Sequence, residues 1–318
     1  MGITGPPASG KTTLWRAISG LAPSGDVAVV KVPDSRVDTL AELHASRKMV
    51  WAQLGVVDVH ATARTAAAAI GRLREMDAVL VVLPAFGGQD PRAALDAIRD
   101  DLVLADMGPV ETRLQRARKD PAAKAEVPAL EAAAEHLSQG EFLSTRGWDS
   151  GELKVFSSLA PITLKPVILV YNIDEATAGD LAGSDLPGIR VSATLEAEVA
   201  GMDPADAREL LNAFGVQEPV TGRVIEAVYR SLDLITFFTT GDDESRAWEV
   251  RKGATAPEAA GVIHSDIQRG FIRAEVMSYD DVVRSGSWDK AKASGLMRVE
   301  GREYVFQEAD VTHFRFAV

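Results

Sequence analysis

The sequence predicts an α/β fold in which helices cover both faces of a parallel sheet, with a helical hairpin inserted into it and a smaller α+β module after it. A glycine-rich motif near the start precedes a helix, near-continuous apolar runs recur between helical segments, and strands near the C-terminus alternate apolar and polar residues. The length of 318 residues exceeds one average domain. We therefore expect two packed units.

The composition excludes several kinds of chemistry. Zero cysteines and five histidines remove thiolate catalysis, disulfides and cysteine-ligated zinc, which leaves oxygen-ligated cations such as magnesium. With 34 basic and 46 acidic residues, the net charge of −12 argues against a non-specific nucleic-acid binder and leaves only a local basic patch open. No apolar run is long enough to span a membrane, and the start does not read as a signal peptide, so we expect a cytoplasmic protein.

The first element is a phosphate-binding loop. Residues 5–12 match the pattern G-x-x-x-x-G-K-[ST], and the following residues open a helix. In such a loop backbone N–H groups surround the phosphates, Lys11 reaches the terminal phosphates and the Thr12 hydroxyl ligates magnesium. The alternative is a glycine-rich turn before an ordinary helix. The predicted nucleotide contacts from this segment are Gly5, Pro6, Pro7, Ala8, Ser9, Gly10, Lys11, Thr12 and Thr13.

Four apolar runs supply the parallel strands, and they lie at residues 27–32, 54–59, 78–83 and 166–171. Asp58, near the end of the second run, is the expected magnesium carboxylate beside Thr12. The alternative for Asp58 is a buried residue that caps the next turn. His60 follows as a catalytic candidate beside Lys11, because a histidine near neutrality can orient the attacking water. A partly exposed strand-end histidine is the alternative.

The stretch from about 91 to 160 predicts an antiparallel helical hairpin inserted between the third and fourth strands. Apolar residues recur there at helical spacing in two series, Val103, Met107, Val110 and Leu114, then Val127, Leu130, Ala134 and Leu137. Pro109 and Pro128 interrupt the pattern, so we expect kinks or late helix starts at these positions.

A base-reading loop is expected directly after the fourth strand, at residues 172–175. In guanine-specific enzymes the fourth residue of such a loop is an aspartate that accepts two guanine N–H groups together. Glu175 moves the carboxylate one methylene further out, so we predict that ATP is preferred and that GTP is the weaker alternative. We place Ser192 and Ala193 beneath the base. The base-side nucleotide contacts are therefore Asn172, Asp174, Glu175, Ser192 and Ala193.

The C-terminal module contains several short strands and a helix. Residues 271–276 and 313–318 alternate as half-buried strands do, and residues 255–258 form a capping box that opens a helix between them. We therefore divide the chain into a nucleotide-binding domain, 1–233, which includes the hairpin, and a compact α+β domain, 234–318.

Several segments resemble the Obg-like ATPase family, also called YchF. They are residues 5–12, 32–38, 101–106 and 172–175, and above all 256–266, 270–276 and 310–316. The resemblance implies a P-loop domain of the translation-factor GTPase class with a coiled-coil insertion, and a C-terminal TGS-like β-grasp domain. It also implies Mg²⁺ and ATP as ligands, the ribosome or RNA as partner through the hairpin and the TGS-like domain, and no membrane or DNA partner.

The sequence departs from the family pattern in both switch regions. Residues 21–26 are too few to contain the family's first switch. In the second switch, Ala61 stands where the family has a glycine, and an alanine-rich run follows at residues 66–69. We therefore expect a translation regulator with slow or impaired ATP hydrolysis. One alternative is a non-hydrolysing ribosome- or RNA-associated binding module. The third alternative, which we rank last, is a small-molecule phosphotransferase that uses the same loop.

Overall fold

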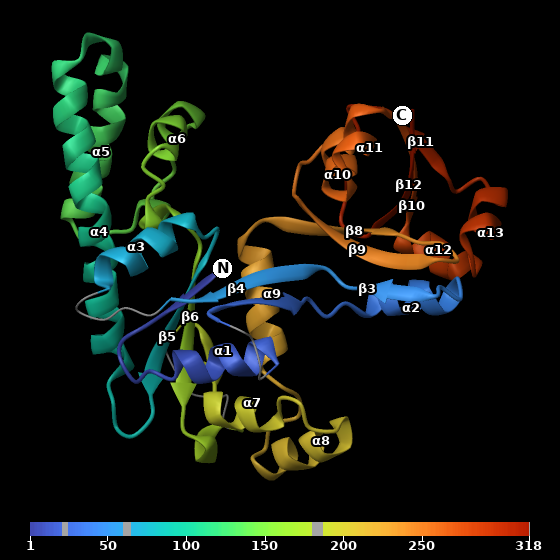
Figure 1. The fold of residues 1–318 in the computed structure, drawn as a ribbon, viewed down its shortest axis with the longest axis horizontal. Helices are drawn as coiled ribbons and strands as arrows, with labels where there is room; N and C mark the ends of the chain where they lie inside the picture. Colours follow the sequence, from blue (N-terminus) through green and yellow to red (C-terminus); the bar gives the residue numbers. More distant parts are fainter. Residues whose placement is uncertain (21–24, 60–64, 180–186, 318) are drawn as a thin grey trace. The chain divides into compact units, whose positions relative to one another are not determined.

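The computed structural model describes the chain except residues 21–24, 60–64, 180–186 and 318, and it divides into two compact units (Figure 1). The first unit consists of Met1–Ala28 and Gly55–Ser231, and the second consists of Val29–Leu54 and Leu232–Val318. Residues 29–54, which the sequence analysis kept in the first domain, instead pack with the second unit.

The first sheet has the strand order β2-β4-β1-β5-β6-β7. The strands are β1 (Gly2–Thr4), β2 (Val27–Lys31), β4 (Gln53–Asp58), β5 (Val79–Ala85), β6 (Val167–Ile173) and β7 (Ile189–Val191). β1 pairs in parallel with β4 and β5, and β6 pairs in parallel with β5 and β7. Residues 79–84 of β5 are all buried, as expected for a central strand covered on both faces. The predicted α/β class is confirmed.

Helices pack around this sheet. They are α1 (Lys11–Ser19), α3 (Ala66–Glu75), α7 (Ala193–Val199), α8 (Pro204–Ala213) and α9 (Thr221–Ser231). Ala69 and Leu73 of α3 form a core with residues of β4, β5 and β6. α1, α7 and α9 contact β1, β6 or one another. These contacts place α1, and with it the loop directly before it, against the sheet.

The predicted helical hairpin is confirmed. It comprises α4 (Pro91–Lys119), η1 (Pro121–Glu126), α5 (Val127–Ser138), η2 (Leu143–Thr145), α6 (Ser150–Ser157) and η3 (Ile162–Leu164). The hairpin has its own core, which includes Val110, Leu114 and Leu130. Pro128 lies in the first turn of α5, where a missing N–H is tolerated, whereas Pro109 lies inside α4. None of the described helices is both long and apolar enough to cross a membrane.

A buried ion pair anchors the root of the hairpin. Asp106 on α4 is 1% exposed and lies 2.8 Å from the Arg74 guanidinium. It also accepts hydrogen bonds from the backbone N–H and the hydroxyl of Thr163, both at 2.8 Å. Arg74 in turn donates to the backbone carbonyls of Ala105, Leu159 and Ala160. One carboxylate therefore ties α4 to α3 and to the chain that returns to β6.

The second unit contains a sheet with the order β11-β10-β12-β8-β9-β3. Its strands are β3 (Lys48–Val50), β8 (Leu234–Thr239), β9 (Glu244–Arg251), β10 (Phe271–Ser278), β11 (Arg298–Glu300) and β12 (Asp310–Phe316). Its helices are α2 (Ser35–Leu43), α10 (Ala256–Ile263), α11 (Ser265–Arg269), α12 (Tyr279–Ser285) and α13 (Trp288–Ala293). The Thr255–Glu258 capping box opens α10 as predicted. The unit is the expected TGS-like domain, enlarged by β3 and α2.

Specific contacts hold residues 34–50 in the second unit, whereas residues 29–31 and 53–54 belong to strands β2 and β4 of the first sheet. β3 adds a parallel strand to β9. Arg36 on α2 pairs with Asp34 at 2.7 Å and with Glu308 at 2.5 Å, and its guanidinium lies 5.1 Å from the ring centroid of Phe238. The Ser46 hydroxyl donates to the Gly241 carbonyl at 2.7 Å. Apart from the Arg36–Asp34 pair, these contacts join residues that are distant in sequence, and local periodicity does not encode them.

Removing the Asp106 carboxylate is expected to weaken the first unit. Asp106→Ala leaves Arg74 without its buried counter-ion and the Thr163 N–H without an acceptor, so the free energy of unfolding should fall by about 3 kcal/mol. Chemical denaturation measures the change. Asp100→Ala, at an exposed position of the same helix, is the control and should change stability by less than about 0.5 kcal/mol. Equal effects of the two substitutions would refute the anchoring role of Asp106.

Candidate functional site

Residues 5–10 form a tight loop between β1 and α1. A Cβ at Gly5 would lie 2.2 Å from the Val82 carbonyl oxygen of β5, and a Cβ at Gly10 would lie 2.2 Å from Asn172 Nδ2. Gly10 caps α1 with a φ of 87°, in the left-handed region. Ala8 is also left-handed, with a φ of 59°. The two motif glycines are therefore required because other parts of the chain approach them closely.

Lys11 is the first residue of α1 and reaches back across this loop. Its Nζ donates a hydrogen bond to the Pro6 carbonyl at 3.1 Å. Burial lowers the pKa of Lys11, and the nearby Asp58 carboxylate partly offsets that effect. Thr12 and Thr13 follow in the first turn, both half-buried, whereas Pro7 and Ala8 are exposed at the loop tip. The ammonium group is therefore held over a loop whose outer rim is open to solvent.

Asp58 ends β4 and is fully buried. Its backbone N–H donates to the Asp26 carbonyl at 2.9 Å, and its carboxylate lies close enough to Lys11 to affect that lysine's pKa. The Thr12 hydroxyl and the Asp58 carboxylate are oxygen donors, which suit magnesium. Within the described part of the chain no three His, Asp or Glu side chains gather into a metal site.

The predicted catalytic residue His60 and the switch residue Ala61 lie outside the described residues, as do residues 21–24 of the shortened first switch.

Asn172, at the end of β6, connects three loops. Its Nδ2 donates to the Ser9 carbonyl at 3.0 Å, and its Oδ1 accepts from the Ala193 N–H at 2.9 Å. The side chain is 6% exposed. Asn172 is also one of the predicted nucleotide contacts, and both polar atoms of its amide bind protein groups in the structure. Asn172 therefore positions the phosphate loop relative to the loop after β7.

A cavity of about 540 Å³ opens beside Asn172. Asp174, Glu175 and Ser192, three of the predicted base-side residues, line it. The Asp174 carboxylate accepts a hydrogen bond from the Gly87 N–H at 3.2 Å, and the Ser192 hydroxyl caps α7. Ala193 contributes its N–H to Asn172 and is not among the lining residues. Glu175 begins the short helix η4 (Glu175–Thr177) and lines the cavity.

Sequence reasoning missed several of the residues that line this cavity, among them Phe86 and Thr194. Phe86 follows β5 directly, and Thr194 lies in the first turn of α7. An aromatic side chain at the carboxyl end of a parallel strand was the available signal for Phe86, because ligands bind at that edge of an open sheet. The phosphate loop and the cavity thus meet at the carboxyl ends of β1, β5 and β6.

Known proteins that are similar to this chain align with it over its whole length. Proteins of Haemophilus influenzae and Bacillus subtilis, each named "Ribosome-binding ATPase YchF", are 34% identical over all of this chain and 99% of their own length. The "Obg-like ATPase 1" of Oryza sativa subsp. indica is 30% identical over all of this chain and 92% of its own length. The structure of the Schizosaccharomyces pombe YchF GTPase matches with a TM-score of 0.90 and 29% identity, covering 99% of this chain and 97% of that one. The family model YchF-GTPase_C, described as a protein of unknown function, matches residues 234–317.

The close approach at Gly10 generates a prediction with a matched control. Gly20 caps the other end of α1, also with positive φ, and a Cβ there would meet nothing within 4 Å. Gly20→Ala should lower the free energy of unfolding only by the cost of placing alanine in the left-handed region, roughly 1 to 2 kcal/mol. Gly10→Ala should cost a further 1 to 3 kcal/mol or so, because Asn172 must move. Urea denaturation compares the two variants, and similar losses would show that Gly10 is needed for its φ alone.

Proposed function

This chain belongs to the Obg-like ATPase family, also called YchF, and from that premise we propose that it binds ATP with Mg²⁺. The phosphates would lie on residues 5–13 and the base in the cavity beside residues 172–175. The observation that carries the proposal is the Asn172 bridge, which fixes the phosphate loop next to a cavity large enough for a purine.

The loop residues would stabilise charge on the phosphoryl group that is transferred. The backbone N–H groups of residues 6–12 and the Lys11 ammonium would bind the phosphate oxygens, and Lys11 would exchange its bond to the Pro6 carbonyl for them. Thr12 and Asp58 would hold magnesium, which neutralises phosphate charge when bound. Partial desolvation of Lys11 favours this exchange, since a poorly hydrated cation loses little water on binding an anion.

Hydrolysis would be slow. The alignment with the Haemophilus influenzae relative extends over 358 positions, whereas this chain has 318 residues, so the relative carries segments that this chain lacks. The short stretch at residues 21–26 and the Ala61 substitution fit that pattern and would leave few groups to position water, with His60 as the candidate. A binding module that does not hydrolyse ATP is the second candidate, which the same shortened segments favour.

Adenine would be preferred over guanine. Glu175 lines the cavity at the position where a guanine-specific loop carries aspartate, and its longer side chain displaces the carboxylate from the guanine N–H groups. A bidentate contact of this kind is worth roughly 1 to 3 kcal/mol of discrimination between bases. ATP would therefore bind better than GTP.

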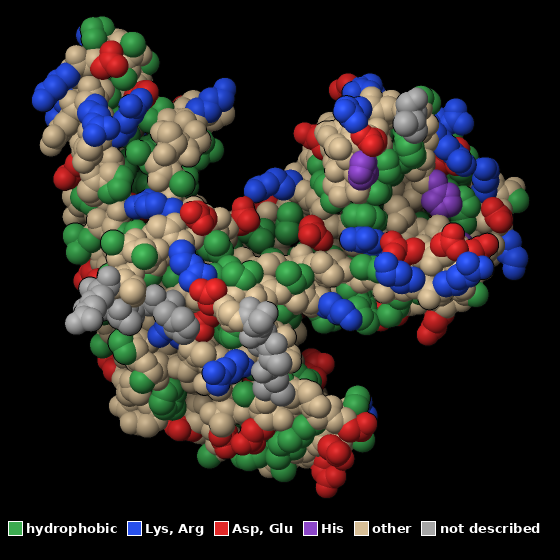
Figure 2. Space-filling view, viewed as in Figure 1, with side chains coloured by type: hydrophobic (Ala, Val, Ile, Leu, Met, Phe, Trp, Pro, Cys, Tyr) green, Lys and Arg blue, Asp and Glu red, His purple; other side chains and the backbone are tan. Residues whose placement is uncertain are grey.

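The partner would be the ribosome, contacted in the cytoplasm through its RNA. The curated relatives are named as ribosome-binding, and the hairpin of this acidic chain carries a basic end (Figure 2). Arg116 and Lys119 of α4 and Lys124 of η1 are exposed, and they form no ion pair with other residues of the described chain. Such free cations suit contacts with backbone phosphates. The TGS-like domain would supply a second contact.

Calorimetric titration of the full chain tests the nucleotide proposal. We expect the wild type to bind ATP with Mg²⁺ more tightly than GTP, and Lys11→Ala to lose most of its affinity for both. Glu175→Asp should raise the affinity for GTP relative to that for ATP by roughly tenfold, since it restores the shorter carboxylate side chain. Phosphate release separates a slow ATPase from the binding module. Failure of the folded wild type to bind either nucleotide would refute the proposal.

Ribosome association is tested by co-sedimentation at several salt concentrations. Arg116→Glu combined with Lys119→Glu should weaken binding at least tenfold and flatten its salt dependence, because two phosphate contacts are lost. Arg208→Glu combined with Arg223→Glu changes the net charge equally at exposed positions of α8 and α9 and serves as the control. Equal weakening by both pairs would show a net-charge effect in place of a contact by the hairpin.

A further inference from the structure

A cavity of about 340 Å³ lies at the root of the hairpin, inside the first unit and apart from the nucleotide site. Val81 of β5 and Val167 and Leu169 of β6 form its floor. Leu95 and Ile98 of α4, with Phe142 of the segment after α5, form its apolar wall. The floor uses the amino-terminal halves of the strands, whereas the nucleotide site lies beyond their carboxyl ends.

The position of α4 explains why this cavity exists. Val167 and Leu169 lie in the part of β6 that pairs with β5, ahead of the residues 170–172 that pair with β7, and both are partly exposed. Leu102 of α4 packs on the sheet, whereas the next residue, Val103, packs in the hairpin core. Phe142 packs against both cores. One helix therefore serves two cores and leaves part of the sheet uncovered where it passes from one to the other.

The polar groups that line the cavity are available to a ligand. Arg99 and Glu141 form an ion pair at 3.3 Å, with side chains 44% and 41% exposed. Such exposed pairs contribute at most about 1 kcal/mol, so an incoming anion can replace Glu141 at the guanidinium at little cost. The Ser144 hydroxyl makes no hydrogen bond to other described residues, whereas that of Thr145 donates to the Phe142 carbonyl at 2.8 Å. An arginine and a hydroxyl thus flank an apolar chamber.

We propose that this cavity binds a small molecule with an apolar, preferably aromatic, body and one anionic group, such as a carboxylate or sulfonate. The body would lie on Val167 and Leu169 beneath α4, and the anion would pair with Arg99. The volume falls at the lower end of the range of known ligand pockets. A ligand there would fill the space between the sheet and α4 and so hold the hairpin root more rigidly.

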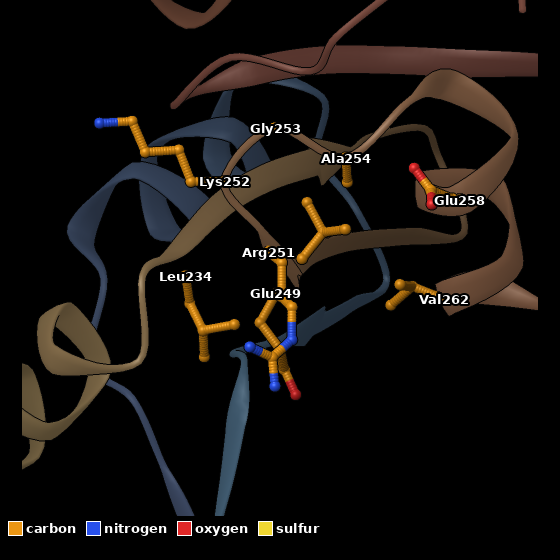
Figure 3. Close-up of a pocket in the computed structure, with 9 residues that line it drawn as sticks. Leu234, Glu249, Arg251, Lys252, Gly253, Ala254, Glu258 and Val262 are labelled. Carbon is orange, nitrogen blue, oxygen red and sulfur yellow. The ribbon is translucent and has the colours of Figure 1, made fainter. Parts of the chain in front are cut away.

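A second cavity, of about 500 Å³, lies in the TGS-like unit and is lined by Arg251 and apolar residues but by no hydroxyl side chain (Figure 3). Its Glu258 carboxylate already accepts from the Thr255 N–H and hydroxyl, both at 2.7 Å. Figure 3 shows the Lys252 side chain pointing away from the other lining side chains. The cavity at the hairpin root is therefore the stronger candidate for an amphipathic anion.

Two fluorescent probes of similar shape test the proposal on the full chain. Anilinonaphthalene sulfonate carries the anion, and N-phenylnaphthylamine lacks it. We expect saturable binding of one sulfonate probe per chain, weakened at least fivefold by Arg99→Gln, while the neutral probe changes less than twofold. Arg118→Gln, which breaks the exposed Arg118–Glu131 pair elsewhere on α4, is the matched control and should leave both probes unaffected.

Filling the cavity should block both probes. Leu95→Trp is expected to lower the affinity for each at least tenfold while circular dichroism stays native. Methyl NMR of the wild type provides a second measurement that needs no variant, because the sulfonate probe should shift the methyl signals of Leu95, Val167 and Leu169. Absence of saturable binding by the wild type, or shifts that map to other residues, would overturn the proposal.

Discussion

The proposed nucleotide site depends on the buried amide of Asn172. One side chain donates to the Ser9 carbonyl and accepts from the Ala193 N–H, so it joins the end of β6 to the loop before α1 and the loop before α7. Each bond contributes about 1 kcal/mol, and leaving either partner unpaired would cost about as much or more. The contact also explains Gly10, because the Asn172 amide occupies the space that a Cβ would need.

The central strands β5 and β6 organise the remainder of the first unit. The carbonyl of Val82 on β5 fixes the path of Gly5, while the carboxyl ends of β5 and β6 provide Phe86 and Asn172. Towards their amino ends, α4 is anchored through Asp106 and Arg74, and the apolar cavity at the hairpin root remains. A parallel sheet thus separates two kinds of surface, a polar one that suits phosphates and an apolar one that suits a hydrocarbon body.

Local sequence signals predicted much of this arrangement. The glycine-rich motif, the apolar strands, the two helical series of the hairpin and the capping box at Thr255 all depend on residues close in sequence, and each appears in the structure. The grouping of residues 29–54 with the C-terminal unit was not predicted, because it arises from β3 pairing with β9 and Arg36 pairing with Glu308. Likewise, the positioning role of Asn172 depends on contacts with Ser9 and Ala193, which sequence spacing cannot reveal.

The central claim is that Asn172 couples the phosphate loop to the base cavity, and Asn172→Asp tests it with almost no change in shape. The substitution keeps an acceptor for Ala193 but places an oxygen against the Ser9 carbonyl, where the donor had been. Calorimetric titration with ATP and Mg²⁺ should show at least tenfold weaker binding for the folded variant, that is, a loss of roughly 1.4 kcal/mol or more. An affinity equal to that of the wild type would contradict the account.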